Sequence, residues 1–256
     1  MTISTSEILK NSREFRIYSI ESREPEWSGN KEWQAFLEQL LLWEKEERLV
    51  RSMKASLSKS RLSKYSQPTG LKDFDWGWPT KINRSELEDL FQLAFLKEKE
   101  NVVLVGPNGV GKTTLLKNLV QESIKSGHSA LFIEASELLD DLGSYDSPTG
   151  LRRRIEHYSK PHLLGIDEIG YLSYNTKHAD LLFQIVHRRS GRGSTAITTN
   201  RSFGEWPELF PNATSVTALV DRLIEKCTVI QIEGPTYRGR MYKENQKRKQ
   251  EQRGNA

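Results

Sequence analysis

The sequence has a single cysteine, Cys227, so it cannot form a disulfide within the chain, and a reduced cytoplasm is the simplest interpretation. It also lacks any run of about 18 apolar residues, which argues against a membrane-spanning helix. The first ten residues, MTISTSEILK, lack the charged-then-apolar order of a secretory signal. We therefore expect a cytoplasmic protein with no membrane partner.

The charge is unevenly distributed, although the net charge is only +4. Residues from Gly234 onward carry seven Lys or Arg and two Glu, a net charge of +5, so the rest of the chain is nearly neutral. A second basic stretch, 51–64, has five positive charges and no acid. Basic ends on a neutral core suit a polyanion such as DNA, because Lys and Arg neutralise phosphates and release counterions. The alternative is a solvated tail without a partner.

The first third of the chain predicts a helical arm. Residues 1–29 show no clean periodicity, and we expect them to be loosely ordered. From Lys31 to about Met53 a wide apolar stripe recurs with helical spacing, and Asn30 is a candidate N-cap. Such a stripe needs a partner surface, in its own core or on a neighbouring subunit. The SQPTG stretch at 66–70 suggests a boundary between this arm and the next domain.

The remainder alternates between short apolar runs and helical patterns. We expect a helix near 85–99, opened by the capping-box spacing of Ser85 and Glu88. Helices are also expected at 112–126, 136–142, 178–189 and 215–226. Strands are expected at 101–106, 130–135, 163–167, 194–200 and 227–232. This alternation predicts an α/β fold with a five-stranded parallel sheet and crossover helices.

The stretch GPNGVGKTT at 106–114 has the G-x-x-x-x-G-K-[ST] spacing, and it follows a strand and opens a helix. Glycines there let main-chain N–H groups close around phosphate oxygens, and the helix N-terminus adds positive potential. Lys112 would reach the β- and γ-phosphates of ATP, and the Thr113 hydroxyl would bind Mg²⁺. A glycine-rich turn without a ligand is the alternative. The expected nucleotide-binding residues are Gly106, Pro107, Asn108, Gly109, Val110, Gly111, Lys112, Thr113 and Thr114.

An apolar strand ends in Asp167 and Glu168 within LLGIDEIG. An aspartate at this position can hold the magnesium ion, and the adjacent glutamate can accept a proton from an attacking water. The pair therefore favours ATP hydrolysis, although two acids at a helix N-terminus would look the same. The next strand ends in Asn200. If that strand lies between the other two, Asn200 would orient the attacking water; otherwise it is a turn residue.

With these elements in order, the chain resembles AAA+ ATPases of the initiator and helicase-loader branch. It is most similar to the IstB-type helper ATPases of bacterial insertion sequences. The similarity covers roughly residues 30–240 and includes LLGIDEIGYLSY, RGSTAITTNRSFGEWPELF and VDRLIEKCTVIQIEG. The block FGEWPELF is its most specific part, because a generic phosphate-loop protein has no reason to carry it.

This resemblance implies an ATP-driven homo-oligomer, a ring or spiral, that assembles on double-stranded DNA, deforms it, and recruits or stimulates a partner transposase. It also implies that an arginine from a neighbouring subunit completes each ATP site. Arg222 is the best match, Lys226 is the next, and a salt bridge capping the helix is the alternative for Arg222. Arg238 is a candidate second sensor. Only about 24 residues follow the last expected strand, so the usual helical lid is reduced or absent, which weakens that assignment.

DNA contacts are harder to assign. The resemblance points to 136–160, yet EASELLDDLGSYD in this segment is acidic. Its basic part consists of Arg152, Arg153 and Arg154, followed by Lys160, and at most one or two adjacent arginines on a helix can face DNA. Lys177 is a further weak candidate, and surface solubility is the alternative for all of them.

The expected division is a helical N-terminal domain at 1–66, an ATPase domain at 67–240 and a basic tail at 241–256. Two other functions remain as alternatives, of which the first has the same core chemistry. One is a DnaC-like helicase loader that acts on a replicative helicase through the N-terminal arm. The other is a monomeric ATP switch or small-molecule kinase that is indifferent to DNA.

Overall fold

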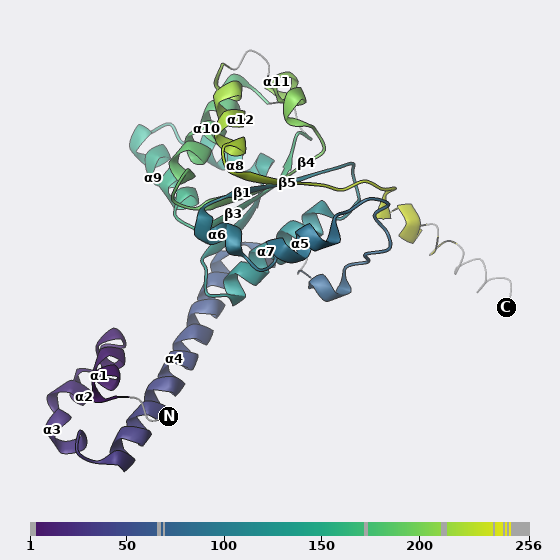
Figure 1. Ribbon diagram of the computed structural model, residues 1–256. Coiled ribbons are helices and arrows are strands. Elements are labelled where there is room, and N and C mark those ends of the chain that lie inside the picture. The colour runs from purple at the N-terminus through teal and green to yellow at the C-terminus, as the bar shows by residue number, and fades with distance from the viewer. Residues whose placement is uncertain are drawn as a thin grey trace. The chain divides into compact units, whose positions relative to one another are not determined.

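The computed structural model describes residues 4–65, 68, 70–171, 174–210, 214–237, 239–242, 244 and 246. Contacts within the chain divide it into two compact units, Met1–Ala55 and Ser56–Ala256. The helix α4, Lys31–Lys59, runs through the division (Figure 1).

The first unit is helical. Before α4 come α1 (Thr5–Glu14), α2 (Tyr18–Ser22) and α3 (Glu24–Trp27), so the expectation of loose order for residues 1–29 was wrong. These helices are too short to show a period, but their apolar residues converge on one face of α4. The buried cluster consists of Ile8, Phe15, Ile20, Trp27, Leu37 and Leu41. Asn30 caps α4 as expected, because its Oδ1 accepts the N–H groups of Glu32 and Trp33.

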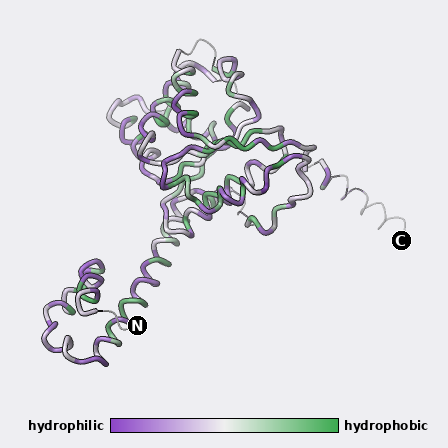
Figure 2. Tube along the Cα trace, in the orientation of Figure 1, coloured by the Kyte–Doolittle hydropathy of each residue, from purple (hydrophilic) through white to green (hydrophobic). Residues whose placement is uncertain are grey.

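The second unit contains the expected five-stranded parallel sheet. Its strands are β1 (Asn101–Val105), β2 (Ala130–Glu134), β3 (Leu163–Ile169), β4 (Ser194–Thr199) and β5 (Cys227–Gln231). Their order across the sheet is β2-β3-β4-β1-β5, and every neighbouring pair is parallel. The three central strands are almost wholly buried, which accounts for the apolar runs of β1 and β3, whereas four of the six buried residues of β4 are Ser or Thr (Figure 2).

Helices cover both faces of the sheet. On one face pack α5 (Arg84–Leu90), α6 (Ala94–Glu98) and α7 (Lys112–Lys125). On the other face pack α8 (Ala135–Gly143), α9 (Pro148–Ser159), α10 (Thr176–Arg189) and α12 (Ser215–Ile224). The short α11 (Trp206–Leu209) joins this second layer. The result is a three-layer α/β unit with a buried cluster on each side of the sheet.

One helix differs from expectation. The expected helix at 85–99 is two helices, α5 and α6, because the chain leaves the helical conformation at Leu93, whose φ is +63°. The cap is also different: Asn83 Oδ1 accepts the Glu86 N–H, whereas Ser85 lies inside α5. Asn83 precedes Ser85 and is an equally good capping residue, so the helix begins earlier.

No helical bundle follows β5 in the part of the chain that the structure describes. The described residues there include a short helical stretch at 239–242.

Candidate functional site

The strand order brings the candidate residues to one edge of the sheet. Because β4 lies between β3 and β1, the carboxyl ends of these three strands are neighbours. The phosphate loop, residues 106–113, follows β1. Asp167 and Glu168 lie near the end of β3, and Asn200 comes directly after β4. The strand that precedes Asn200 therefore lies between the other two, as the suggested role of Asn200 requires.

The phosphate loop is closely packed. Gly109 and Gly111 have φ values of +79° and +103°, a conformation that glycine adopts readily. A side chain on Gly111 would also collide with the Phe74 ring, 2.9 Å from the position of a Cβ. A Cβ on Gly109 would lie too close to Thr236 Oγ1. At both positions, therefore, the backbone conformation and the close neighbours favour glycine.

Lys112 opens α7, and its side chain is folded into the loop. Its Nζ donates to the carbonyls of Gly106 at 2.6 Å and Pro107 at 2.8 Å, and the residue is only 5% exposed. Gly111, the N-cap of α7, has no side chain to cap the helix. The positive end of the helix and the ammonium group therefore meet at one place, which suits a phosphate.

Asp167 lies buried at the end of β3 between two hydroxyls. Thr113 donates to its Oδ1 at 3.1 Å, and Thr198 on β4 donates to the same atom at 2.5 Å. Burial raises the pKa of Asp167, and the two hydroxyl hydrogen bonds oppose that shift. One hydroxyl and one carboxylate oxygen at this spacing fit Mg²⁺, which binds few protein oxygens and keeps several waters.

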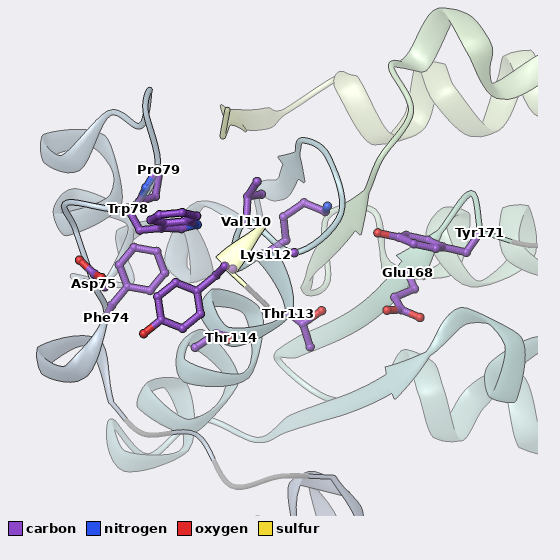
Figure 3. A pocket seen from close by; sticks show the side chains of 13 residues that line it. Phe74, Asp75, Trp78, Pro79, Val110, Lys112, Thr113, Thr114, Glu168 and Tyr171 are labelled. Carbon is purple, nitrogen blue, oxygen red and sulfur yellow. The ribbon is translucent and has the colours of Figure 1, made fainter. Parts of the chain in front are cut away.

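Glu168 adopts the left-handed conformation, with φ of +63°. Its N–H donates to Thr198 Oγ1 at 2.8 Å, and the pairing of β3 with β4 shifts register between Ile166 and Ile169. A non-glycine residue held in this conformation stores strain, which is common at functional sites. The Glu168 side chain lines the same cavity as Lys112 (Figure 3).

Asn200 lies against the turn that follows Glu168. A Cβ on Gly170, whose φ is +104°, would lie 3.0 Å from Asn200 Oδ1. This amide oxygen is buried and has no hydrogen-bond partner within the described residues. Because an unpaired buried acceptor is costly, it points to a partner such as a bound water or ligand.

The cavity beside the phosphate loop has a volume of about 360 Å³ and contains a subsite that the sequence analysis missed. Beyond the loop its lining is aromatic, and in Figure 3 Phe74 and Trp78 lie on one side of Lys112 while Glu168 and Tyr171 lie on the other. The lining residues outside the loop are Phe74, Asp75, Trp78, Pro79, Thr114, Glu168, Tyr171 and Tyr237. The three aromatic residues of DFDWGWP, at 73–79, were the feature of the sequence that could have indicated this subsite.

Tyr171 closes the cavity on the side of β3. Its hydroxyl donates to Asn108 Oδ1 at 2.5 Å, which links the turn after β3 to the tip of the phosphate loop. Tyr171 therefore connects the turn after β3 to the phosphate loop, on the side of Lys112 opposite Phe74 and Trp78.

A profile described as "IstB-like ATP binding protein" matches residues 14–245. The chain belongs to this IstB-like family of ATP-binding proteins. It is 34% identical over 204 residues to the ATP-binding protein of insertion sequence IS232 from Bacillus thuringiensis subsp. berliner, covering 80% of this chain and 82% of that one. It is 33% identical over 221 residues to the IS5376 protein of Geobacillus stearothermophilus, covering 85% and 87%.

Two solved structures resemble about two thirds of this IstB-like protein. DnaI matches with a TM-score of 0.53 and 23% identity, over 65% of this chain and 89% of that one. A replication initiator DnaA bound to AMPPCP and single-stranded DNA matches with a TM-score of 0.54 and 17% identity, over 65% and 50%. These similarities support the AAA+ fold that the sequence predicted.

The FGEWPELF block of this family member is built into the second helical layer. Trp206 and Phe210 are fully buried, and the Phe210 ring stacks on Tyr174 with centroids 4.6 Å apart. The Tyr174 hydroxyl accepts the Gly170 N–H at 3.3 Å. The block therefore supports the turn at Gly170, which follows Glu168 and lies against Asn200.

The candidate arginine of the IstB-like chain lies away from its own cavity. Arg222 on α12 is exposed, pairs with Glu225 at 3.1 Å, and is not among the cavity-lining residues. Lys226 is exposed as well. Arg238 and most of the 241–256 tail lie outside the described residues.

The candidate DNA-contacting residues of the IstB-like chain differ in exposure and in their contacts within the chain. Arg154 donates to Asp141 at 2.6 Å and to the Tyr158 hydroxyl, whereas Arg152 and Arg153 are exposed. Lys160 is exposed, and Lys177 donates to the Gly143 carbonyl at 3.2 Å. No described helix is long and apolar enough to cross a membrane.

Proposed function

We propose that the chain is the ATP-hydrolysing helper of an insertion sequence, which assembles on double-stranded DNA and acts on the transposase of the same element. The observation that carries this proposal is that Lys112, Thr113 and Glu168 line one cavity, and that Thr113 donates a hydrogen bond to the buried Asp167. The similarity to insertion-sequence ATP-binding proteins supports the transposition role.

ATP would lie along the cavity with its phosphates in the phosphate loop. Lys112 Nζ would exchange its two carbonyl partners for oxygens of the β- and γ-phosphates. Thr113 and Asp167 would hold Mg²⁺, which when bound neutralises charge on the phosphates. The base would lie among the rings of Phe74, Trp78 and Tyr237.

Hydrolysis would transfer the γ-phosphoryl group to water. Glu168 would accept the water proton, since its backbone conformation and its bond to Thr198 hold it beside the cavity. The Asn200 amide would orient this water, because its oxygen has no other partner among the described residues. The products would be ADP and phosphate.

The ATP site would be completed by a second copy of the chain. Arg222 lies on an exposed helix and outside its own cavity, which suits a group donated to the ATP of a neighbouring subunit. Such a positive charge would stabilise the charge that develops on the transferred phosphoryl group. Lys226, next on the chain after Glu225, is the alternative donor.

Images of negatively stained protein with duplex DNA and a non-hydrolysable ATP analogue test this proposal. Rings or spirals on DNA are the expected result, and addition of the partner transposase should give a joint complex. Protein that stays monomeric, or that instead forms a stable complex with a replicative helicase and ignores DNA, would contradict the transposition role.

A further inference from the structure

The chain after β5 returns to the cavity and lies against the segment before α5. Glu233 N donates to the Lys81 carbonyl at 2.9 Å, and Lys81 N donates to the Glu233 carbonyl at 3.3 Å, forming an antiparallel bridge. Gly234 then passes so close that a Cβ would lie 3.1 Å from Thr80 N. These contacts hold two segments side by side that are far apart in the sequence.

Residues 235–237 continue onto the phosphate loop. Tyr237 N donates to the Gly109 carbonyl at 2.8 Å, and Trp78 Nε1 donates to the Pro235 carbonyl at 2.9 Å. The Trp78 and Tyr237 rings are 5.9 Å apart with an interplanar angle of 77°. The aromatic wall of the cavity is therefore made from both segments and is attached to the loop.

Arg240 connects the segment after β5 to the segment before α5 through its side-chain contacts. Its guanidinium lies 4.9 Å from the centre of the Trp78 ring and 3.1 Å from Asp75 Oδ2, and it also pairs with Glu244 at 2.6 Å. The Arg240 and Asp75 side chains are each 39% exposed. Exposed contacts of this kind contribute little to the stability of a fold, so they can break without unfolding the unit.

We propose that residues 235–237 and Arg240 form a clasp that holds a purine base against Trp78 and opens for nucleotide exchange. The proposal rests on the proposed function, because it requires ATP in the cavity. Trp78 and Tyr237 line the cavity and contact each other, so displacement of Trp78 breaks its contacts with both Tyr237 and Arg240. The clasp thus controls the release rate, whereas the phosphate loop holds the triphosphate.

The release rate of a ribose-labelled fluorescent ATP, chased with excess ATP, tests the clasp in the full-length protein. Arg240→Ala should release nucleotide about two- to fivefold faster, as expected for the loss of one exposed cation–π contact. Arg84→Ala is the matched control, because Arg84 lies 4.9 Å from the Trp76 ring and pairs with Glu88 at 2.8 Å, yet neither Arg84 nor Trp76 lines the cavity. It should release nucleotide at the wild-type rate.

A second comparison distinguishes binding of the base from binding of the phosphates. Trp78→Ala should weaken ATP binding at least about tenfold, since stacking on an aromatic ring is lost, and should leave the affinity for inorganic tripolyphosphate unchanged. Arg240→Lys, which keeps the charge beside Asp75, should give an intermediate release rate. Wild-type release from Arg240→Ala, or equal effects of Arg240→Ala and Arg84→Ala, would overturn the clasp. Failure of the wild-type chain to bind ATP would instead overturn the proposed function.

Discussion

The hydroxyl of Thr113 lies 3.1 Å from Oδ1 of Asp167, so the first turn of α7 and the end of β3 meet through one hydrogen bond. Thr113 belongs to the phosphate loop and Asp167 to the strand that carries Glu168. A magnesium ion bound by these two oxygens would connect the phosphates of ATP to the carboxylate that activates water.

Lys112→Ala removes the ammonium group from the phosphate loop. ATP binding should fall strongly, and ATP-dependent oligomers should be lost, because no other side chain of the loop carries a positive charge. Equilibrium titration with a fluorescent ATP analogue measures the binding. Lys125→Ala, at the far end of the same helix, is the control and should bind normally. Retained affinity in Lys112→Ala would contradict the assignment.

Thr198→Val tests a residue that only the structure reveals. Thr198 donates to Asp167 and accepts the Glu168 N–H, so the substitution removes the support of both carboxylate residues while keeping the shape of the side chain. Hydrolysis should fall about tenfold or more, as for other residues that orient metal ligands, with ATP affinity little changed. Thr198→Ser, which keeps the hydroxyl, should retain most of the activity. Equal rates for the Val and Ser variants would show that the hydroxyl is dispensable.

The fold and the position of the phosphate loop after the first strand were predictable, and the aromatic lining of the cavity was not. Apolar runs such as NVVLV and LLGI mark buried parallel strands, and the loop motif follows the first of them directly. Trp78 and Tyr237, in contrast, are 159 residues apart in the sequence, and only the fold brings them together. The cap at Asn83 was missed for a simpler reason, since Asn83 and Ser85 are both acceptable N-caps.

DNA binding should be largely independent of sequence and sensitive to salt. Because phosphate contacts dominate such binding, the logarithm of the affinity should fall linearly with the logarithm of the salt concentration. Deletion of residues 241–256, which carry five of the positive charges near the end of the chain, should make the slope shallower. Fluorescence anisotropy with a labelled duplex measures both slopes. An unchanged slope would mean that the tail does not touch DNA.

Arg222→Ala should bind ATP almost normally, hydrolyse it poorly and assemble badly on DNA, because Arg222 lies outside its own cavity. An arginine supplied by a neighbour contributes about 10³–10⁵ in rate in other phosphate-loop systems. A mixture of Arg222→Ala with Lys112→Ala should recover part of the activity at high protein concentration, since some interfaces pair an intact cavity with an intact arginine. Co-assembly without recovery would exclude Arg222 and favour Lys226.

The proposed function requires ATP hydrolysis at the carboxyl edge of β1, β3 and β4, with Glu168 as the base. The single-turnover rate of ATP hydrolysis by Glu168→Gln, at saturating nucleotide and with duplex DNA, tests it most directly. The substitution leaves Asp167 and the phosphate loop intact, so ATP should still bind while the rate falls about 10²-fold or more. Hydrolysis at the wild-type rate would exclude Glu168 as the base.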